Sequence, residues 1–382
     1  LWDGEAGDNL WTPGANWDGD LLPSSNADVV INNAGEVTLP SGTVTVNTLS
    51  INNGLGLIVS AGATLNVNNS GPSNTVSISG SALQVNVAGT VNITGGGHGI
   101  DMNGVEWSTR PGGETHISSY SGDGYYATNG GTLDNRGTMT ISGGLSGVNI
   151  SDGQLNTISG SVLTVQNTSG PGISVIGGGI VSNWGSMNLN NCVGTSLNAE
   201  TIFNAATGNL SITNSGGTGI HAITAFTNWG TLTITGATTG IYLDDANYEN
   251  TGSITISGTN GPAFDFDDNG GSYTFSNTGT LKGTGTFDMA GNSLGGTIVP
   301  GTSPGTMTYP VSQTFTASCT LEVEVNGTTP NTEHDQIVVG GTATISGTLD
   351  ASINYLPSNG DRIVIITATA ISGTFSTVTL PN

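Results

Sequence analysis

The feature that most constrains the fold is a short segment that recurs along the middle of the chain. It reads N-x-G followed by alternating apolar and small polar residues, as in FTNWGTLTI and YENTGSITI. Copies follow one another at intervals of about 24 residues. Such a period, with short alternating strands between Gly- and Asn-containing turns, is typical of one coil of a β-solenoid. The Asn of each copy is at Asn135, Asn183, Asn228, Asn250 or Asn277, with looser copies at Asn156 and Asn204.

Other positions keep a fixed distance from this Asn. Apolar residues stand two residues before it and four and six residues after it, and Gly stands two residues after it. Since side chains alternate between the two faces of a strand, these positions predict one apolar face. We expect the Asn column to form a turn ladder, because Asn tolerates left-handed backbone angles and its amide can bond up and down the stack. The Gly lets neighbouring turns pass closely. A ligand-binding row of Asn is the functional alternative.

The two ends of the chain break this repeat. Residues 1–30 carry Trp2, Trp11 and Trp17, which predict an aromatic cap over the open first coil. Aromatic rings that stack on sugars are the alternative for this segment. The expected organisation is therefore an all-β chain with the cap at 1–30, a parallel β-helix at 31–298 and a β-rich C-terminal region at 299–382.

Composition excludes several classes of partner. The chain has 4 Lys and Arg against 27 Asp and Glu, which gives a net charge of -23. So few basic residues cannot neutralise many phosphates, so we expect no nucleic-acid partner. The longest apolar run, near Ile363–Ile366, is far shorter than the roughly 20 residues of a transmembrane helix. Cys192 and Cys319 lie far apart without metal-ligand spacing, and we expect buried or unpaired thiols.

The C-terminal region resembles a known family. The run PGTSPG from Pro300, the strand LEVEVNG from Leu321, HDQIVV from His334 and GTATISGTL from Gly341 resemble the C-terminal passenger region of bacterial autotransporter-type surface proteins. The N-x-G-T-L-T-I coils are similar to haemagglutinin- and adhesin-type β-helices. The resemblance implies a right-handed parallel β-helix, an extracellular location at the bacterial cell surface and an adhesin-like or structural role. It implies no catalytic residue.

Residues 101–131 form the longest apparently irregular insertion between coils. Loops on a rigid scaffold often carry function, and aromatics with an Arg and carboxylates suit a carbohydrate or another polar partner. A loop that packs against the side of the coils is the simpler alternative, and catalysis is a third. The candidate ligand-binding residues are Trp107, Arg110, Glu114, His116, Tyr120, Asp123, Tyr125 and Tyr126.

A second candidate is acidic. If Ile241 aligns with Phe264, the pairs Asp244-Asp245 and Asp267-Asp268 lie one coil apart and stack at about the strand spacing of ~4.8 Å. Carboxylates that close repel one another unless they are solvated, protonated or bridged by a cation, and calcium is the natural bridge. A solvated turn and the carboxylates of a glycosidase are the alternatives.

These observations predict a non-catalytic, secreted or cell-surface structural or adhesin-like rod that requires no cofactor, with calcium as the one candidate ion. Self-association into a fibre or surface layer and cell-surface or matrix polysaccharide are the candidate interactions. A carbohydrate-binding or polysaccharide-degrading β-helix is the alternative. Ice binding is a lesser alternative, because the expected Thr face is mixed: its paired positions include Thr138/Thr140, Ser186/Asn188, Thr231/Thr233 and Thr280/Lys282.

Overall fold

The computed structural model describes residues 1–32, 35–52, 56–80, 84–244, 247–267, 274–289, 291–302 and 304–380. Within these ranges the chain is all-β, and its single short helix is a 3-10 turn, η1 (Gly14–Asn16). No helix of these ranges is long and apolar enough to cross a bilayer. The contacts divide the chain into two compact units, residues 1–201 and 202–382, which are described separately.

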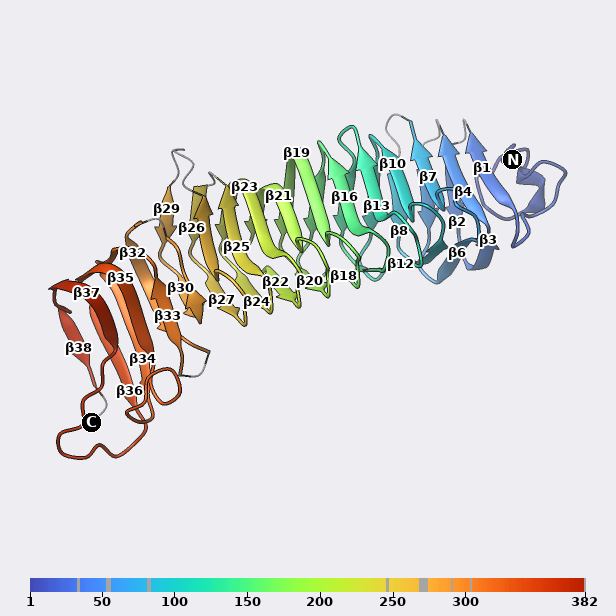
Figure 1. Ribbon diagram of the computed structural model, residues 1–382. Coiled ribbons are helices and arrows are strands. Elements are labelled where there is room, and N and C mark those ends of the chain that lie inside the picture. The colour runs from blue at the N-terminus through green and yellow to red at the C-terminus, as the bar shows by residue number, and fades with distance from the viewer. Residues whose placement is uncertain are drawn as a thin grey trace. The chain divides into compact units, whose positions relative to one another are not determined.

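Unit 1 is a parallel β-solenoid whose strands stack on three faces (Figure 1). The first face holds β1 (Asp28–Asn32), β4 (Thr48–Asn52), β7 (Val76–Ser79), β10 (Ile100–Asn103), β13 (Asp123–Thr128), β16 (Ser146–Ser151) and the start of β19 (Ile173–Asn183). The second face holds β2 (Glu36–Leu39), β5 (Gly56–Val59), β8 (Gln84–Val87), β11 (Glu106–Thr109), β14 (Thr132–Asn135), β17 (Gln154–Thr157) and the end of β19. The third face holds β3 (Gly42–Val46), β6 (Ala63–Asn69), β9 (Thr90–Gly95), β12 (Glu114–Ser118), β15 (Thr138–Ser142), β18 (Val162–Gln166) and β20 (Ser186–Asn190).

Unit 2 continues with parallel strands of the same kind, and β21 (Leu197–Asn204) spans the division. Its first and second faces hold β23 (Thr218–Asn228), β25 (Thr239–Asp244), β26 (Asn247–Asn250), β28 (Phe264–Asp267) and β29 (Phe275–Asn277). Its third face holds β22 (Asn209–Thr213), β24 (Thr231–Thr235), β27 (Ser253–Ser257), β30 (Thr280–Gly283), β32 (Leu294–Pro300), β34 (Gln313–Val325), β36 (Thr348–Ile353) and β38 (Thr377–Thr379). A further ladder holds β31 (Gly285–Thr286), β33 (Thr306–Tyr309), β35 (Gln336–Ile345) and β37 (Ile366–Gly373).

The 24-residue period is most regular on the third face of unit 1, where Thr90, Glu114, Thr138, Val162 and Ser186 are aligned in register. Alternate residues of these strands point inward and outward, as the apolar alternation predicts. Two inward columns are fully or almost fully buried. One consists of Val91, Thr115, Met139, Leu163 and Met187, and the other of Ile93, Ile117, Ile141, Val165 and Leu189. The predicted parallel β-solenoid is confirmed.

The Asn column forms a buried hydrogen-bonded ladder. In unit 2 the Nδ2 of Asn204 donates to the Oδ1 of Asn228 at 2.7 Å, that of Asn228 to Asn250 at 2.8 Å, and that of Asn250 to Asn277 at 2.7 Å. All four side chains are at most 4% exposed. An amide both donates and accepts, so each Asn satisfies the next, and the predicted ladder is confirmed.

Two details of that prediction are wrong. In unit 1, Thr157 and not Asn156 stands in the column between Asn135 and Asn183, because the two neighbouring coils differ in length by four residues. None of the ladder Asn residues has a left-handed backbone. Left-handed positions instead follow third-face strands at Ser119, Asn167, Asn191 and Asn214, and first-face strands at Asn129 and Asp152, with φ between 54° and 60°.

The Gly two residues after the ladder Asn marks a close approach of successive coils. A Cβ on Gly252 would overlap the carbonyl oxygen of Gly230, and one on Gly230 would overlap those of Ala205 and Gly208. These glycines do not have a positive φ, so they are required by the distance between coils and not by backbone conformation.

The N-terminal segment lies over the edge of the first coil. Trp2 N donates to the carbonyl of Val30 at 2.9 Å, and Trp11 N donates to that of Thr38 at 2.7 Å. Trp2 and Trp11 both contact Trp17, with ring centroids 5.1 and 4.9 Å away, and the three side chains are at most 5% exposed. Their rings are occupied by packing and are not available to stack on a sugar.

The prediction of an irregular loop at residues 101–131 is wrong. This segment forms most of β10 and all of β11, β12 and β13, in register with the coils before and after it. Trp107 occupies the inward position between Val85 and Leu133, and Tyr125 that between Ile100 and Val148. Trp107 and Tyr125 thus continue interior columns and do not project from a loop.

Removing one amide from the ladder should destabilise the protein. In Asn228→Ala the buried Oδ1 of Asn250 loses the Asn228 donor and Asn204 loses its Asn228 acceptor, so we expect a loss of roughly 2–3 kcal/mol of unfolding free energy. Chemical denaturation followed by circular dichroism measures it. Asn209→Ala, at an exposed position of β22 in the same unit, is the control and should change stability by less than about 0.5 kcal/mol. Equal effects of the two substitutions would contradict a stabilising ladder.

The two cysteines should be inert while the protein is folded. Both are unpaired and buried, and burial raises the pKa of Cys192 and raises that of Cys319 from 9.0 to about 12. Since the thiolate is the reactive species, we expect almost no labelling by a disulfide reagent at pH 8 and two equivalents after unfolding. Because the folded pKa lies above the unfolded one, this contribution to stability is constant below pH 9 and declines as the pH rises towards 12. Rapid labelling of the native protein would contradict the buried placement.

Candidate functional site

The structure does not bring the eight residues predicted at 101–131 together. Trp107, Tyr120, Asp123 and Tyr125 are at most 5% exposed. Trp107 and Tyr125 are at inward strand positions, Asp123 begins β13, and Tyr120 lies in the turn between β12 and β13. The other four reach the surface at three separate places of unit 1: Arg110 at a corner, Glu114 and His116 together on the third face, and Tyr126 on the first face. Arg110 Nε donates to Asn86 Oδ1 at 2.8 Å, and His116 Nε2 lies 3.4 Å from Glu114 Oε2 on the third face.

Two of these residues join a small network on the first face. The Tyr126 ring stacks on His98, with centroids 4.8 Å apart and planes 15° apart. The backbone N–H of Asp123 donates to His98 Nδ1 at 3.1 Å, while the buried Asp123 carboxylate accepts from Ser146 Oγ and from Asn149 Nδ2. Asp123 thus has hydrogen-bond partners in His98, Ser146 and Asn149, so we interpret this network as one that stabilises the contact between successive coils.

The acidic candidate is partly described. Ile241 aligns with Phe264 and Asp244 with Asp267, as the sequence alignment of the coils requires. Asp245 and Asp268 lie outside the described residues, so calcium at these four positions stays a prediction. Near Asp244, the His221 ring lies 5.1 Å from Tyr242, and burial lowers the pKa of His221 while the Asp244 charge opposes that shift.

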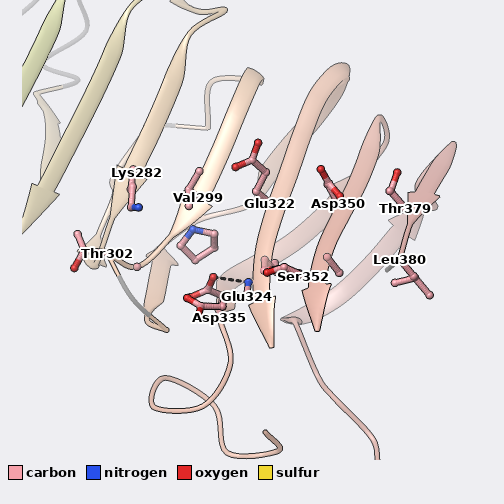
Figure 2. A pocket seen from close by; sticks show the side chains of 14 residues that line it. Lys282, Val299, Thr302, Glu322, Glu324, Asp335, Asp350, Ser352, Thr379 and Leu380 are labelled. Carbon is pink, nitrogen blue, oxygen red and sulfur yellow. Dashed lines mark hydrogen bonds between the residues drawn. The ribbon is translucent and has the colours of Figure 1, made fainter. Parts of the chain in front are cut away.

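A polar cleft of about 380 Å³ opens on the third face near the C-terminal end of unit 2 (Figure 2). Lys282 lies at one side of it, while Glu322 and Asp350 stand in register on β34 and β36. Asp335 is 3% exposed, and its carboxylate accepts the N–H groups of Gly305 and Glu324, each at 2.8 Å. Burial raises the pKa of Asp335, against these two hydrogen bonds, which lower it.

The sequence did not single out this cleft. Its charged residues come from β30, β34, β36 and the segment before β35, so they are far apart along the chain. A signal was present in LEVEVNG, whose alternation sets Glu322 and Glu324 on the outward side of a strand. Among the described residues, no group of three or more His, Cys, Asp and Glu side chains is arranged to hold a metal ion. The carboxylates of the cleft are suited to a basic side chain or a hydrated cation.

The third face also presents rows of polar side chains, most of them uncharged. In unit 1 one outward row reads Asn66, Asn92, His116, Thr140, Thr164, Asn188. Asn92 Nδ2 donates to Asn66 Oδ1 at 2.8 Å along this row. In unit 2 the rows read Asn209, Thr231, Ser253, Thr280 and Ser211, Thr233, Thr255, Lys282. The predicted alignment of these positions is confirmed, and hydroxyl and amide groups thereby repeat at the strand spacing, ~4.8 Å.

Comparison with known proteins gives a weak structural likeness only. No protein-family model matches the chain, and no curated protein matches it. Among solved structures the chain is similar to a TibC-catalysed hyper-glycosylated TibA fragment, with 17% sequence identity and a TM-score of 0.31. That comparison covers 89% of this chain and 99% of the fragment. The solenoid fold described above rests on the strand register of this chain itself.

Proposed function

We propose that the chain is a non-catalytic, adhesin-like scaffold at the outside of a bacterial cell, and that it attaches to hydroxyl-rich matrix polysaccharide. The observation that carries the proposal is the third face, where amide and hydroxyl groups, interrupted by Glu114, His116 and Val162, stand in parallel, in-register rows. The sequence resemblance of the C-terminal region to autotransporter passengers supports the location.

The chemistry of the rows suits this role. Hydroxyl and amide groups can each donate and accept, so they match sugar hydroxyls in either orientation. Each contact is weak, but a surface that offers many of them at once gains from effective concentration. In the unit 1 row that contains Thr140 and Thr164, all members other than His116 carry no ionisable group.

The interior supports the same role through rigidity. Buried columns and the Asn ladder join each coil to the next, so the outward groups are held at fixed spacing before any ligand arrives. A preorganised surface loses less conformational entropy on binding than a mobile one. The net charge of -23 disfavours contact with anionic lipid and nucleic acid, while contact with a neutral polysaccharide is not opposed by charge.

Introducing charge into the third face should weaken attachment. In the double variant Thr140→Asp/Asn188→Asp two carboxylates enter one outward row, and we expect several-fold fewer protein-coated beads to stay on immobilised cellulose or dextran under flow, because desolvating these charges is costly. Ser50→Asp/Ser174→Asp makes the same charge change on the first face and is the matched control.

Two results would contradict the proposal. Equal bead retention for both double variants and the parent would remove the third face as the attachment surface. Release of reducing ends or of unsaturated uronates from a panel of polysaccharides, above a heat-inactivated blank, would contradict the non-catalytic part.

A further inference from the structure

The second face of unit 1 carries a hollow of about 410 Å³ that none of the sites above includes. It lies over β11, β14 and β17 and reaches the corner that follows them. The residues that matter for its chemistry are Glu106, Asp134, Arg136, Gln154, Asn156 and Trp184.

Strand register builds the floor of this hollow from two polar rows. One row aligns Glu106, Thr132 and Gln154, and the other aligns Asp134 with Asn156. Gln154 is exposed and Asn156 is partly exposed. Within the described part of the chain, no side-chain hydrogen bond uses either amide, so both are open to a ligand.

The corner supplies the cation and the aromatic ring. Arg136 follows Asn135 and Trp184 follows Asn183, at equivalent positions two coils apart. Arg136 Nε donates to Asp134 Oδ2 at 2.6 Å, which holds the guanidinium beside the floor and compensates the buried Asp134 carboxylate. The remaining guanidinium N–H groups can still donate to a ligand. Trp184 is partly exposed and lines the hollow two coils farther along.

This set of groups fits a sugar. Amides and a guanidinium–carboxylate pair offer donors and acceptors for hydroxyl groups, while an indole packs against the apolar face of a hexose ring. Acidic sugars fit worse, because Glu106 and Asp134 bring two carboxylates against one guanidinium in a chain of net charge -23. We propose that this hollow binds a short stretch of neutral, hexose-based polysaccharide. The inference deepens the proposed attachment to polysaccharide and rests on it for its biological role.

The sequence contained only part of the signal for this site. The middle residue of N-x-G is Arg136 in LDNRG and Trp184 in VSNWG, and it varies while its neighbours are fixed. The period predicts that such residues stack at one corner, but the different coil lengths hide that Asn156 and Gln154 come to lie beside them.

The test is titration of the full chain with cellohexaose, mannohexaose and maltohexaose as neutral probes and with hexagalacturonate as the acidic one, by calorimetry. We expect at least one neutral probe to bind, hexagalacturonate to bind more weakly, and Trp184→Ala to weaken neutral binding about tenfold, as the loss of a stacked ring implies. Gln154→Ala, at an exposed position, should weaken it severalfold without change in melting temperature.

Trp229→Ala is the matched control, because Trp229 follows the ladder residue Asn228 in unit 2, is 45% exposed and does not line this hollow. It should leave affinity unchanged. The proposal is overturned if no neutral probe binds, if hexagalacturonate binds more tightly, or if Trp184→Ala and Gln154→Ala bind like the parent. Bead attachment that depends on the third face while the neutral probes fail to bind would overturn this inference alone. Probe binding without third-face dependence of attachment would overturn the proposed function alone.

Discussion

The structure depends on one constraint, which is that parallel strands of successive coils pair in register. Each side chain then lies about 4.8 Å from the side chains at the equivalent position of the preceding and the following coil. Burying an Asn side chain would ordinarily cost free energy, because its amide loses hydrogen bonds to water. Here the preceding coil supplies a donor and the following coil an acceptor. The same proximity excludes a Cβ at Gly252, where the backbone of the preceding coil is already in contact.

The constraint also decides where charge can lie. If a column repeated one charged residue, that residue would face a like charge on each neighbouring coil. Like charges directly opposite one another destabilise a sheet. Some charged groups in the described part of the chain stand beside unlike partners, as in Arg136 with Asp134 and His116 with Glu114. In unit 2, by contrast, Glu322 stands in register with Asp350 and Asp244 with Asp267. Buried carboxylates such as Asp335 are held by backbone N–H groups. The outward rows are left to Thr, Ser and Asn, which tolerate repetition.

Sequence reasoning succeeded where a residue depends on its own column. The Asn ladder, the close Gly and the alignment of Asp244 with Asp267 follow from the period alone. It failed where coil length changes, so that Asn156 was placed in the column of Thr157, and where N-x-G is missing, as in 101–131. The hollow on the second face could not be predicted, because its residues belong to different columns of successive coils and meet only through the corner geometry.

That corner explains how a repetitive fold can acquire a specific site. Within N-x-G the Asn is committed to the buried ladder and the Gly to the contact between coils, so both are fixed by the stack. The residue between them is exposed or partly exposed: Arg136 and Trp184 in unit 1, and Trp229, Thr251 and Thr278 in unit 2. Arg110 and Ile158 hold the same corner position in coils where Thr109 and Thr157 stand in the column of the Asn. It can therefore change without disturbing the interior. Since neighbouring corners lie one strand spacing apart, a few substitutions there set unlike side chains close together on a rigid frame.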